Sequence, residues 1–267
     1  MCESLLAALV SAVALAVSPA QFLQAHAVNG AFAEPGGPAD PALTAWAVLG
    51  LRAARVDAPG SLAYLQANEA SLQSTTDVAL VALAERALGA EPEALFARLT
   101  AARRPSGQIG DTLNSTMWAV LALGRSTTAT TRFVLAHQAR SGGFAWSIGG
   151  QPDSNDTAAA LELMRVAHVT GRPVARAVAF LRTFERRDGG FELTHGRGSD
   201  AQSTAWAIQG LVAADRKPPR AAFAYLARLR RPDGSYRYSA AYVTTPMWVT
   251  AQVLAALAKQ PFPLRPA

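Results

Sequence analysis

Cysteine is nearly absent from this chain of 267 residues, which carries only Cys2. A single cysteine excludes an intrachain disulfide and a metal site built from several thiolates, and it argues against a catalytic thiol. The four histidines show no paired ligand spacing such as His-Glu-x-x-His. We therefore expect neither a bound metal nor another cofactor.

Charge is also scarce, since charged residues make up 16% of the chain and Lys217 and Lys259 are its only lysines. The net charge of +6 comes from arginines. They form spaced pairs such as Arg186 and Arg187, at the ends of apolar periodic stretches, where a cation stabilises the negative end of a helix dipole. No RNP, zinc-finger or homeodomain pattern accompanies them. We therefore expect no nucleic-acid partner.

Several enzyme signatures are missing as well. The sequence contains no Gly-x-Ser-x-Gly, no P-loop and no Gly-x-Gly-x-x-Gly, which leaves serine-hydrolase, nucleotide and dinucleotide sites without support. Aromatic residues are few, at 7%, although hydrophobic residues reach 50% and alanine is the commonest type. Small apolar side chains suit closely packed helices, so the composition predicts a folded, all-α protein.

One apolar run stands near the start, from Leu5 to Val17. It is too short to span a bilayer and has the length of a signal-peptide core. Small residues allow cleavage after Ala16 or after Ala20. Glu3 is the only charge of this leader, so the usual positive flank is missing, and a buried first helix of the fold is the alternative interpretation.

The leader interpretation sets the expected domains and location. We predict a signal peptide over residues 1–20, a mature domain over residues 21–267 and a secreted or extracytoplasmic protein. No later run reaches about 18 apolar residues, so no stable membrane span is expected once the leader is removed.

A repeat runs along the rest of the chain and is its most informative feature. Its unit is a helical stretch, a glycine turn ending in an aromatic residue, and a second apolar helix that opens in most copies with threonine. The clearest turns are Asn29-Gly30-Ala31-Phe32, Ser141-Gly142-Gly143-Phe144, Asp188-Gly189-Gly190-Phe191 and Asp233-Gly234-Ser235-Tyr236. The helices that follow open with Thr44-Ala45-Trp46, Thr116-Met117-Trp118, Thr157-Ala158-Ala159, Thr204-Ala205-Trp206 and Pro246-Met247-Trp248.

Six helical hairpins account for the whole mature chain. First helices are amphipathic, whereas second helices are apolar almost all round and must be buried. Six such pairs can close into two concentric rings, a single (α/α)6 barrel with the second helices inside. An open solenoid would need polar caps at both ends, so we predict the closed barrel. The expected hairpins cover residues 21–54, 59–88, 91–125, 127–169, 172–215 and 218–259.

This pattern resembles the α/α-toroid repeat family of terpene cyclases and protein prenyltransferase β subunits. The cyclase repeat of Gln, three residues, Gly, one residue and an aromatic matches Gln138 to Phe144. The other copies have a different residue at the glutamine position. The resemblance implies the toroid fold and an isoprenoid-like substrate class. The prenyltransferases use a cysteine among their zinc ligands, which the mature chain lacks.

The segment Asp153-Ser154-Asn155-Asp156-Thr157-Ala158 resembles the Asp-x-Asp-Asp-Thr-Ala motif of class II terpene cyclases. The resemblance makes the middle residue the general acid, but that residue is Asn155, and an amide has no acidic proton to deliver. Asp153 and Asp156 are then the candidate catalytic acids. The alternative is helix capping, since Asp40, Asp153 and Asp200 each lie four residues before the repeat threonine.

Four tryptophans occupy the same position in four repeats: Trp46, Trp118, Trp206 and Trp248. They are predicted to form one layer near the rim of the barrel, where they either line an apolar pocket or fill the end of the barrel. Trp146 lies in a rim loop beside the Asp153 segment. We take these five residues, with Asn155 and Asp200, as candidate ligand-binding residues.

The sequence favours an exported toroid that binds an apolar, isoprenoid-like small molecule at the barrel mouth. The alternative is a single-domain class II terpene cyclase that uses Asp153 or Asp156. A corrinoid-binding barrel remains open because the larger domain of cobalamin-binding proteins has the same architecture. Glycan cleavage remains open as well, with Asp153 and Asp200 as its carboxylate pair.

Overall fold

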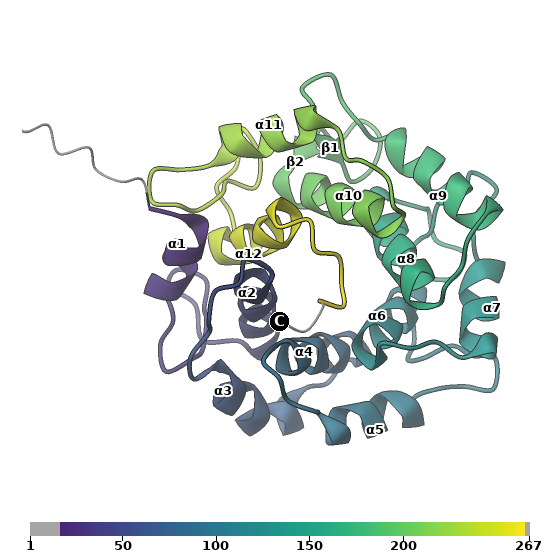
Figure 1. The fold of residues 1–267 in the computed structure, drawn as a ribbon, viewed down its shortest axis with the longest axis horizontal. Helices are drawn as coiled ribbons and strands as arrows, with labels where there is room; N and C mark the ends of the chain where they lie inside the picture. Colours follow the sequence, from purple (N-terminus) through teal and green to yellow (C-terminus); the bar gives the residue numbers. More distant parts are fainter. Residues whose placement is uncertain (1–16, 265–267) are drawn as a thin grey trace, which may run out of the picture.

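The computed structural model describes residues 17–264 and shows two concentric rings of helices (Figure 1). The outer ring holds the first helix of each hairpin and the inner ring holds the second. A 3-10 turn (Glu69–Ser71) and a two-stranded antiparallel sheet complete the described elements. The outer helices are α1 (Pro19–Ala25), α3 (Ser61–Ala67), α5 (Glu93–Ala101), α7 (Thr128–Ala136), α9 (Arg172–Arg182) and α11 (Arg220–Leu229). The inner helices are α2 (Pro41–Ala53), α4 (Thr75–Ala87), α6 (Leu113–Leu123), α8 (Ser154–Val166), α10 (Ala201–Ala213) and α12 (Pro246–Leu257).

The inner ring is closed, because α12 packs directly against α2 (Figure 1). A glycine makes this contact close: a Cβ added at Gly50 would lie 2.5 Å from the carbonyl oxygen of Ala251. Gly210 allows the same close approach of α10 to Ala158 in α8. The predicted (α/α)6 barrel is thus confirmed, and its six hairpins lie where the repeat placed them.

The repeat motif connects the glycine turn to the inner helix by the same hydrogen bond in five of the six hairpins. The glycine of each turn has a positive φ, between 79° and 103°, which only glycine adopts without strain. The aromatic or aliphatic residue after the turn then donates its backbone N–H to the threonine hydroxyl of the inner helix, at 2.9–3.0 Å. The five pairs are Phe32 with Thr44, Ile109 with Thr116, Phe144 with Thr157, Phe191 with Thr204, and Tyr236 with Thr250.

These pairs correct the register predicted for the sixth hairpin. The sequence pattern equated Pro246 with the repeat threonines, whereas the structure gives that position to Thr250, one helical turn later. Gln252 therefore takes the tryptophan position, and Trp248 lies one turn nearer the start of α12. The layer predicted for four tryptophans holds three.

The inner helices start on side-chain caps, as predicted for the three aspartates. Asp40, Asp153 and Asp200 each accept a hydrogen bond from the backbone N–H three residues later, at 2.7–2.8 Å. Helix α12 has no such cap of its own. Glu34, from the first hairpin, instead accepts the backbone N–H groups at the start of α12 at 2.8 and 3.1 Å. This carboxylate ties the last hairpin to the first and helps to close the ring.

The predicted signal peptide falls mostly on residues 1–16, which lie outside the described residues. The described chain begins just before α1, whose cap is Ser18. Arg186 and Arg187 lie four and five residues beyond the end of α9, in the turn, rather than at the helix end itself. Among the helices that the structure describes, none combines the length and the apolar character that crossing a bilayer requires.

Candidate functional site

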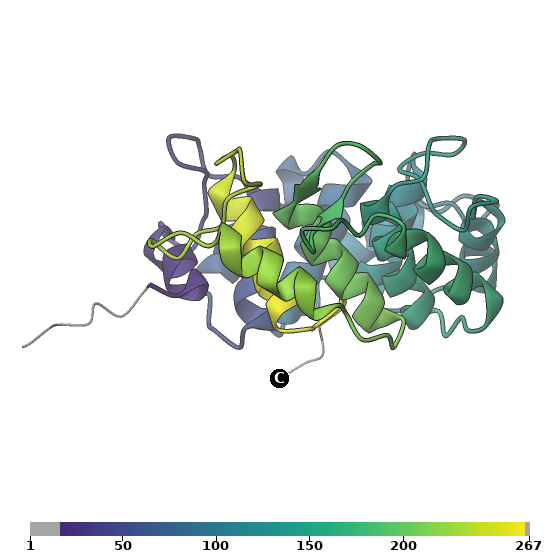
Figure 2. The ribbon, with the colours of Figure 1, turned by 90° about the horizontal axis from the view of Figure 1, so that it is seen from above.

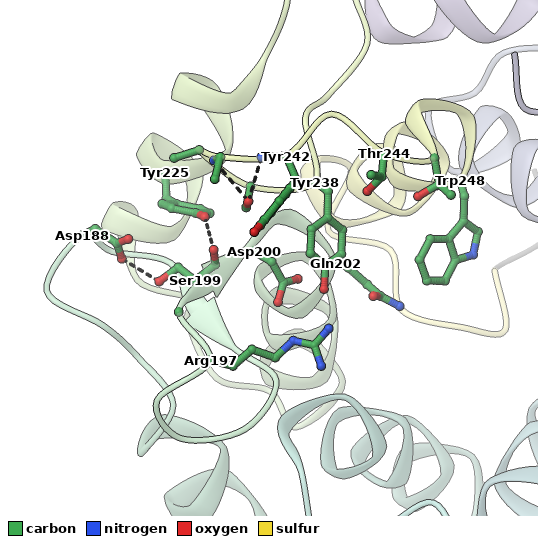
Figure 3. Close-up of a pocket in the computed structure, with 15 residues that line it drawn as sticks. Asp188, Arg197, Ser199, Asp200, Gln202, Tyr225, Tyr238, Tyr242, Thr244 and Trp248 are labelled. Atoms are coloured by element: carbon green, nitrogen blue, oxygen red, sulfur yellow. Dashed lines mark hydrogen bonds between the residues drawn. The ribbon is translucent and has the colours of Figure 1, made fainter.

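A pocket opens on the face of the barrel where the inner helices begin, which we call the rim. It lies between α10 and α12 and has a volume of about 810 Å³, within the range of small-molecule sites. Gln202 and Trp248 form part of its wall, each at the start of an inner helix (Figure 3). The rest of the lining comes from the loops before these helices and from α11, and includes Arg197, Asp200, Tyr225, Tyr238 and Tyr242.

Ionisable groups gather on one side of this rim pocket, where Arg197, Asp200 and Tyr238 lie close together (Figure 3). Burial raises the pKa of Asp200, although its hydrogen bonds from Ser203 and the charge of Arg197 oppose that rise. Burial also raises the pKa of Tyr238, as does the nearby carboxylate of Asp200. The pocket thus offers a cation and a phenol hydroxyl beside aromatic surface.

The loop that carries Arg197 is organised by a buried carboxylate. Strands β1 (Phe191–Glu192) and β2 (Ser199–Asp200) frame this loop as an antiparallel pair. Glu192 is 1% exposed and accepts the backbone N–H groups of Gly196 and Gly198 at 3.0 and 3.1 Å. His195 lies 3.4 Å from the same carboxylate and stacks on Phe184 with the ring centroids 4.3 Å apart. The contacts of His195 therefore support the loop that presents Arg197 to the pocket.

The cyclase-like acid motif forms a second cluster on the rim. Asp153 caps α8, and the carboxylate of Asp156 accepts a hydrogen bond from the side chain of Asn114 in α6 at 2.7 Å. Burial raises the pKa of both aspartates, and the neighbouring charge of Asp153 raises that of Asp156 further, well above its usual range. Asn155 is half-buried and accepts a hydrogen bond from Ser154 at 3.2 Å. Two neighbouring carboxyl groups with raised pKa values are thus present, next to the amide of Asn155.

Three of the predicted tryptophans meet on the barrel axis. Trp46, Trp118 and Trp206 pack edge to face, with ring centroids 5.3, 5.6 and 6.0 Å apart. All three are less than 10% exposed. The indole N–H of Trp206 donates to Gln252 at 3.1 Å. The rings fill the barrel at this level, and Gln202 and Trp248 stand one turn above them at the rim.

Below the tryptophans, the lumen is filled by a segment that the sequence did not single out. Phe262 follows α12, is fully buried, and lies 6.0–6.5 Å from the rings of the same three tryptophans. Its backbone N–H donates to the carboxylate of Glu162 in α8 at 2.9 Å. Burial raises the pKa of Glu162 to about 8. The lumen therefore has an aromatic upper part and a polar lower part.

The sequence-predicted residues thus separate into three groups. Asp200 and Trp248 lie in the rim pocket, Asp153, Asn155 and Asp156 form the acid cluster, and the other inner tryptophans fill the lumen. Trp146 stands on the rim loop, 54% exposed, and its backbone carbonyl accepts the N–H of Asn114.

The residues that the sequence did not reveal are Arg197, Tyr238, Glu192, Glu162 and Phe262. The length of the loop before α10 was the only signal for Arg197, and nothing marked Phe262. Within residues 17–264, no three His, Cys, Asp or Glu side chains gather as a metal site would require.

Comparisons with known proteins establish the fold. A scan against protein-family models gives no match, and a search of the curated proteins finds no relative. Among solved structures, a protein from Actinoplanes matches with a TM-score of 0.68 and 17% identity, over 90% of this chain and 97% of that one. The type II terpene cyclase MstE from Scytonema, as its R337A variant with geranylgeranyl dihydroxybenzoate, gives 0.67 and 18%, over 90% and 95%.

Protein geranylgeranyltransferase-I of Candida albicans, complexed with GGPP, gives a TM-score of 0.63 and 13% identity, over 85% of this chain and 86% of that one. At these identities the likeness establishes architecture alone. The chain therefore has the α/α-toroid fold found in type II terpene cyclases and protein prenyltransferases, as its repeats predicted.

Proposed function

We propose that this protein is an exported toroid that binds an isoprenoid-like ligand in the rim pocket. The observation that carries this proposal is the pocket of about 810 Å³ at the barrel mouth, walled by Trp248 and tyrosines and supplied with one arginine. A ligand with an apolar chain and a polar head matches that lining. The chain would lie along Trp248 and the head would meet Arg197 and Tyr238.

The fold comparisons support the ligand class. The cyclase from Scytonema was solved with a geranylgeranyl compound and the transferase from Candida albicans with GGPP. Both ligands combine a long isoprenoid chain with a polar group. Because sequence identity is below 25%, this support concerns the class of ligand and extends to no particular compound.

Binding of farnesol, a fifteen-carbon isoprenoid alcohol, and of its diphosphate to the purified protein tests the proposal. Trp248→Ala should weaken binding of both by about tenfold or more, since a buried aromatic contact is worth on the order of 1–2 kcal/mol. Arg197→Met should weaken binding of the diphosphate much more than that of the alcohol. Trp146→Ala, which removes an exposed ring outside the pocket, is the matched control. Equal binding by Trp248→Ala and the unmodified protein would refute the assignment of the pocket.

A second candidate is a type II terpene cyclase, and the acid cluster favours it. The raised pKa values of Asp153 and Asp156 favour their protonated forms, which an acid that protonates an alkene requires. A single toroid suits this candidate, since this chain covers 95% of the MstE chain, which bears the name of a type II terpene cyclase.

Incubation with linear isoprenoids tests this second candidate. A cyclase should give cyclic products that disappear in Asp153→Asn and in Asp156→Asn, and Asn155→Asp should increase turnover by restoring the acid that the motif lacks. Product analysis by gas chromatography and mass spectrometry would show either outcome. Turnover that survives both asparagine variants would rule out these acids.

A further inference from the structure

The segment that follows α12, residues 258–264, turns back across the lower opening of the inner ring (Figures 1 and 2). Its backbone is irregular, and its side chains are half-buried or exposed except for Phe262. That one ring enters the lumen and contacts the three tryptophans. Phe262 is thus the only fully buried side chain among residues 258–264, while Ala258 and Leu264 pack against the core from its edge.

The backbone N–H groups of residues 258–260 donate to carbonyls of α12, whereas the polar contacts of residues 261–263 come from α8. Glu162 accepts the backbone N–H of Phe262, and Arg165 donates to the backbone carbonyls of residues 261–263, with its shortest contact of 2.7 Å at Phe262. Pro261 and Pro263 on either side have no N–H to donate. The segment is therefore attached through three consecutive peptide groups to one turn of α8.

The lower lumen around Phe262 holds more polar groups than this segment satisfies. In the described part of the chain, the second carboxylate oxygen of Glu162 and both polar atoms of Gln209 lack a hydrogen-bond partner. Both side chains are fully buried and belong to the adjacent inner helices α8 and α10. Buried groups of this kind are normally paired. The closed arrangement thus leaves buried polar groups unpaired, and an open state that admits water to Glu162 and Gln209 would satisfy them.

We propose that residues 258–264 act as a displaceable plug, whose Phe262 occupies the space that the apolar chain of a ligand takes when it enters from the rim pocket. This inference rests on the proposed function and names a regulation of the same site. Withdrawal of Phe262 would leave a space beneath Trp46, Trp118 and Trp206 and free Glu162 for a hydroxyl or a water. In the closed state Phe262 packs against the three tryptophans from below, so the rim pocket accepts only the outer part of a ligand.

Hydrogen exchange of the unmodified protein tests the plug without any ligand. A plug opens without unfolding the barrel, so the amide of Phe262 should exchange at least about 100-fold faster than that of Ala251 in α12, at a rate insensitive to low denaturant. An amide of Phe262 that exchanges as slowly as Ala251, and with the same denaturant dependence, would show a fixed part of the core and overturn the proposal.

Farnesol then tests whether the ligand displaces the plug. Saturation with farnesol should speed exchange at Phe262 about tenfold or more. Phe262→Ala should bind farnesol about 10- to 100-fold more tightly, because a rarely open site lowers the apparent affinity by its open fraction. Phe144→Ala, which truncates an equally buried ring under the rim, is the control and should leave the affinity unchanged. Phe262→Leu serves if the alanine variant does not fold.

The outcomes separate the two proposals. Equal farnesol affinity in the unmodified protein and Phe262→Ala, with unchanged protection of Phe262, would overturn the plug and leave the rim site standing. Failure of both proteins to bind farnesol would refute the isoprenoid function together with the gating role. The ligand-free exchange rate of Phe262 would still decide whether the segment opens.

Discussion

The two ends of the barrel are built on different principles. At the rim, turns repeat around the ring, the three aspartates that precede inner helices cap them, and one threonine hydroxyl after another receives a backbone N–H. At the lower opening, a single segment without a counterpart in the other hairpins fills the lumen. Around it, Glu162 and Gln209 are fully buried and incompletely hydrogen-bonded.

This difference indicates which end is rigid and which end can change. Repeated packing and repeated hydrogen bonds between the turns and the inner helices favour one stable arrangement at the rim. Each unpaired buried polar atom destabilises the fold by about 1–3 kcal/mol. The closed lower end bears this penalty, and a conformation that pairs these atoms would avoid it. The rim pocket thus lies at the end of the barrel that we expect to be rigid.

Truncating one buried phenylalanine at each end of the barrel should show the largest difference in stability between the two ends. Phe144→Ala should lower the free energy of unfolding by about 3–5 kcal/mol, the usual cost for a fully buried phenylalanine. Phe262→Ala should cost less than half as much, because undocking of its segment limits the loss. Urea denaturation of both variants measures the contrast. Equal losses would mean that the lower end is as firmly packed as the rim.

The pH dependence of stability should come partly from the lower end. The pKa of Glu162 is raised to about 8 in the folded protein, so the folded state binds the extra proton and stability falls as the pH rises from about 4.5 to about 8. Glu162→Gln removes this loss, which is on the order of 2–4 kcal/mol. Glu85, with a pKa of about 7, titrates in the same window, so the variant must be compared with the unmodified protein at each pH.

Urea midpoints for the unmodified protein and Glu162→Gln between pH 5 and pH 9 provide the check. The variant should be the more stable of the two at pH 9, and the gap should narrow toward pH 5. A gap that does not change with pH would show that Glu162 keeps an ordinary pKa.

The repeated contact at the rim predicts a smaller effect. Thr204→Val should leave the backbone N–H of Phe191 buried and unpaired, which lowers the free energy of unfolding by about 1–3 kcal/mol. Thr204→Ser keeps the hydroxyl and should lose much less. The two variants are compared by thermal denaturation. A valine variant as stable as the serine variant would show that the hydrogen bond is not what holds the turn.

The smallest effect concerns the start of α1, where the outer ring closes. Ser18 and Gln21 form a reciprocal cap, and Arg230 donates to the carbonyl of Val17 at 2.7 Å. Cleavage after Ala20 would remove these contacts, whereas cleavage after Ala16 keeps them. We therefore predict that removal of the proposed leader leaves Val17, rather than Gln21, as the first residue, which mass spectrometry of a secreted form can determine. Ser18→Ala should cost about 0.5–2 kcal/mol.

Most of the fold could be predicted because each hairpin repeats the same local rules. A glycine with positive φ, an apolar helix and a capping aspartate act over a few residues, so the capping alternative for Asp153 and Asp200 is confirmed. The sixth hairpin was aligned wrongly because Trp248 resembles the repeat tryptophan but lies one helical turn before the equivalent position in α12. Only the hydrogen bond from Tyr236 to Thr250 reveals its true register.

The site was less predictable, because its residues come from several hairpins. Arg197 faces the pocket because the Glu192 carboxylate accepts two backbone N–H groups of the loop that carries it. Tyr238 lies near Asp200 because the fifth and sixth hairpins are adjacent in the ring. The aspartates of the acid motif were visible in sequence, yet their raised pKa values arise from burial against α6. These features depend on contacts between hairpins, which a short sequence pattern does not reveal.

The sequence by itself determined the helical class, the six hairpins, which helices are buried and where inner helices are capped, since these follow from local periodicity and short-range hydrogen bonds. The tertiary structure alone decided that Glu34 closes the ring, that three tryptophans meet on the axis, and that Phe262 fills the space beneath them. The physical reason is how far apart in the sequence the interacting residues lie. Hydrophobic packing and burial of polar groups depend on residues far apart in the sequence, up to 214 positions for Glu34 and Trp248, and only the closed barrel brings them into contact.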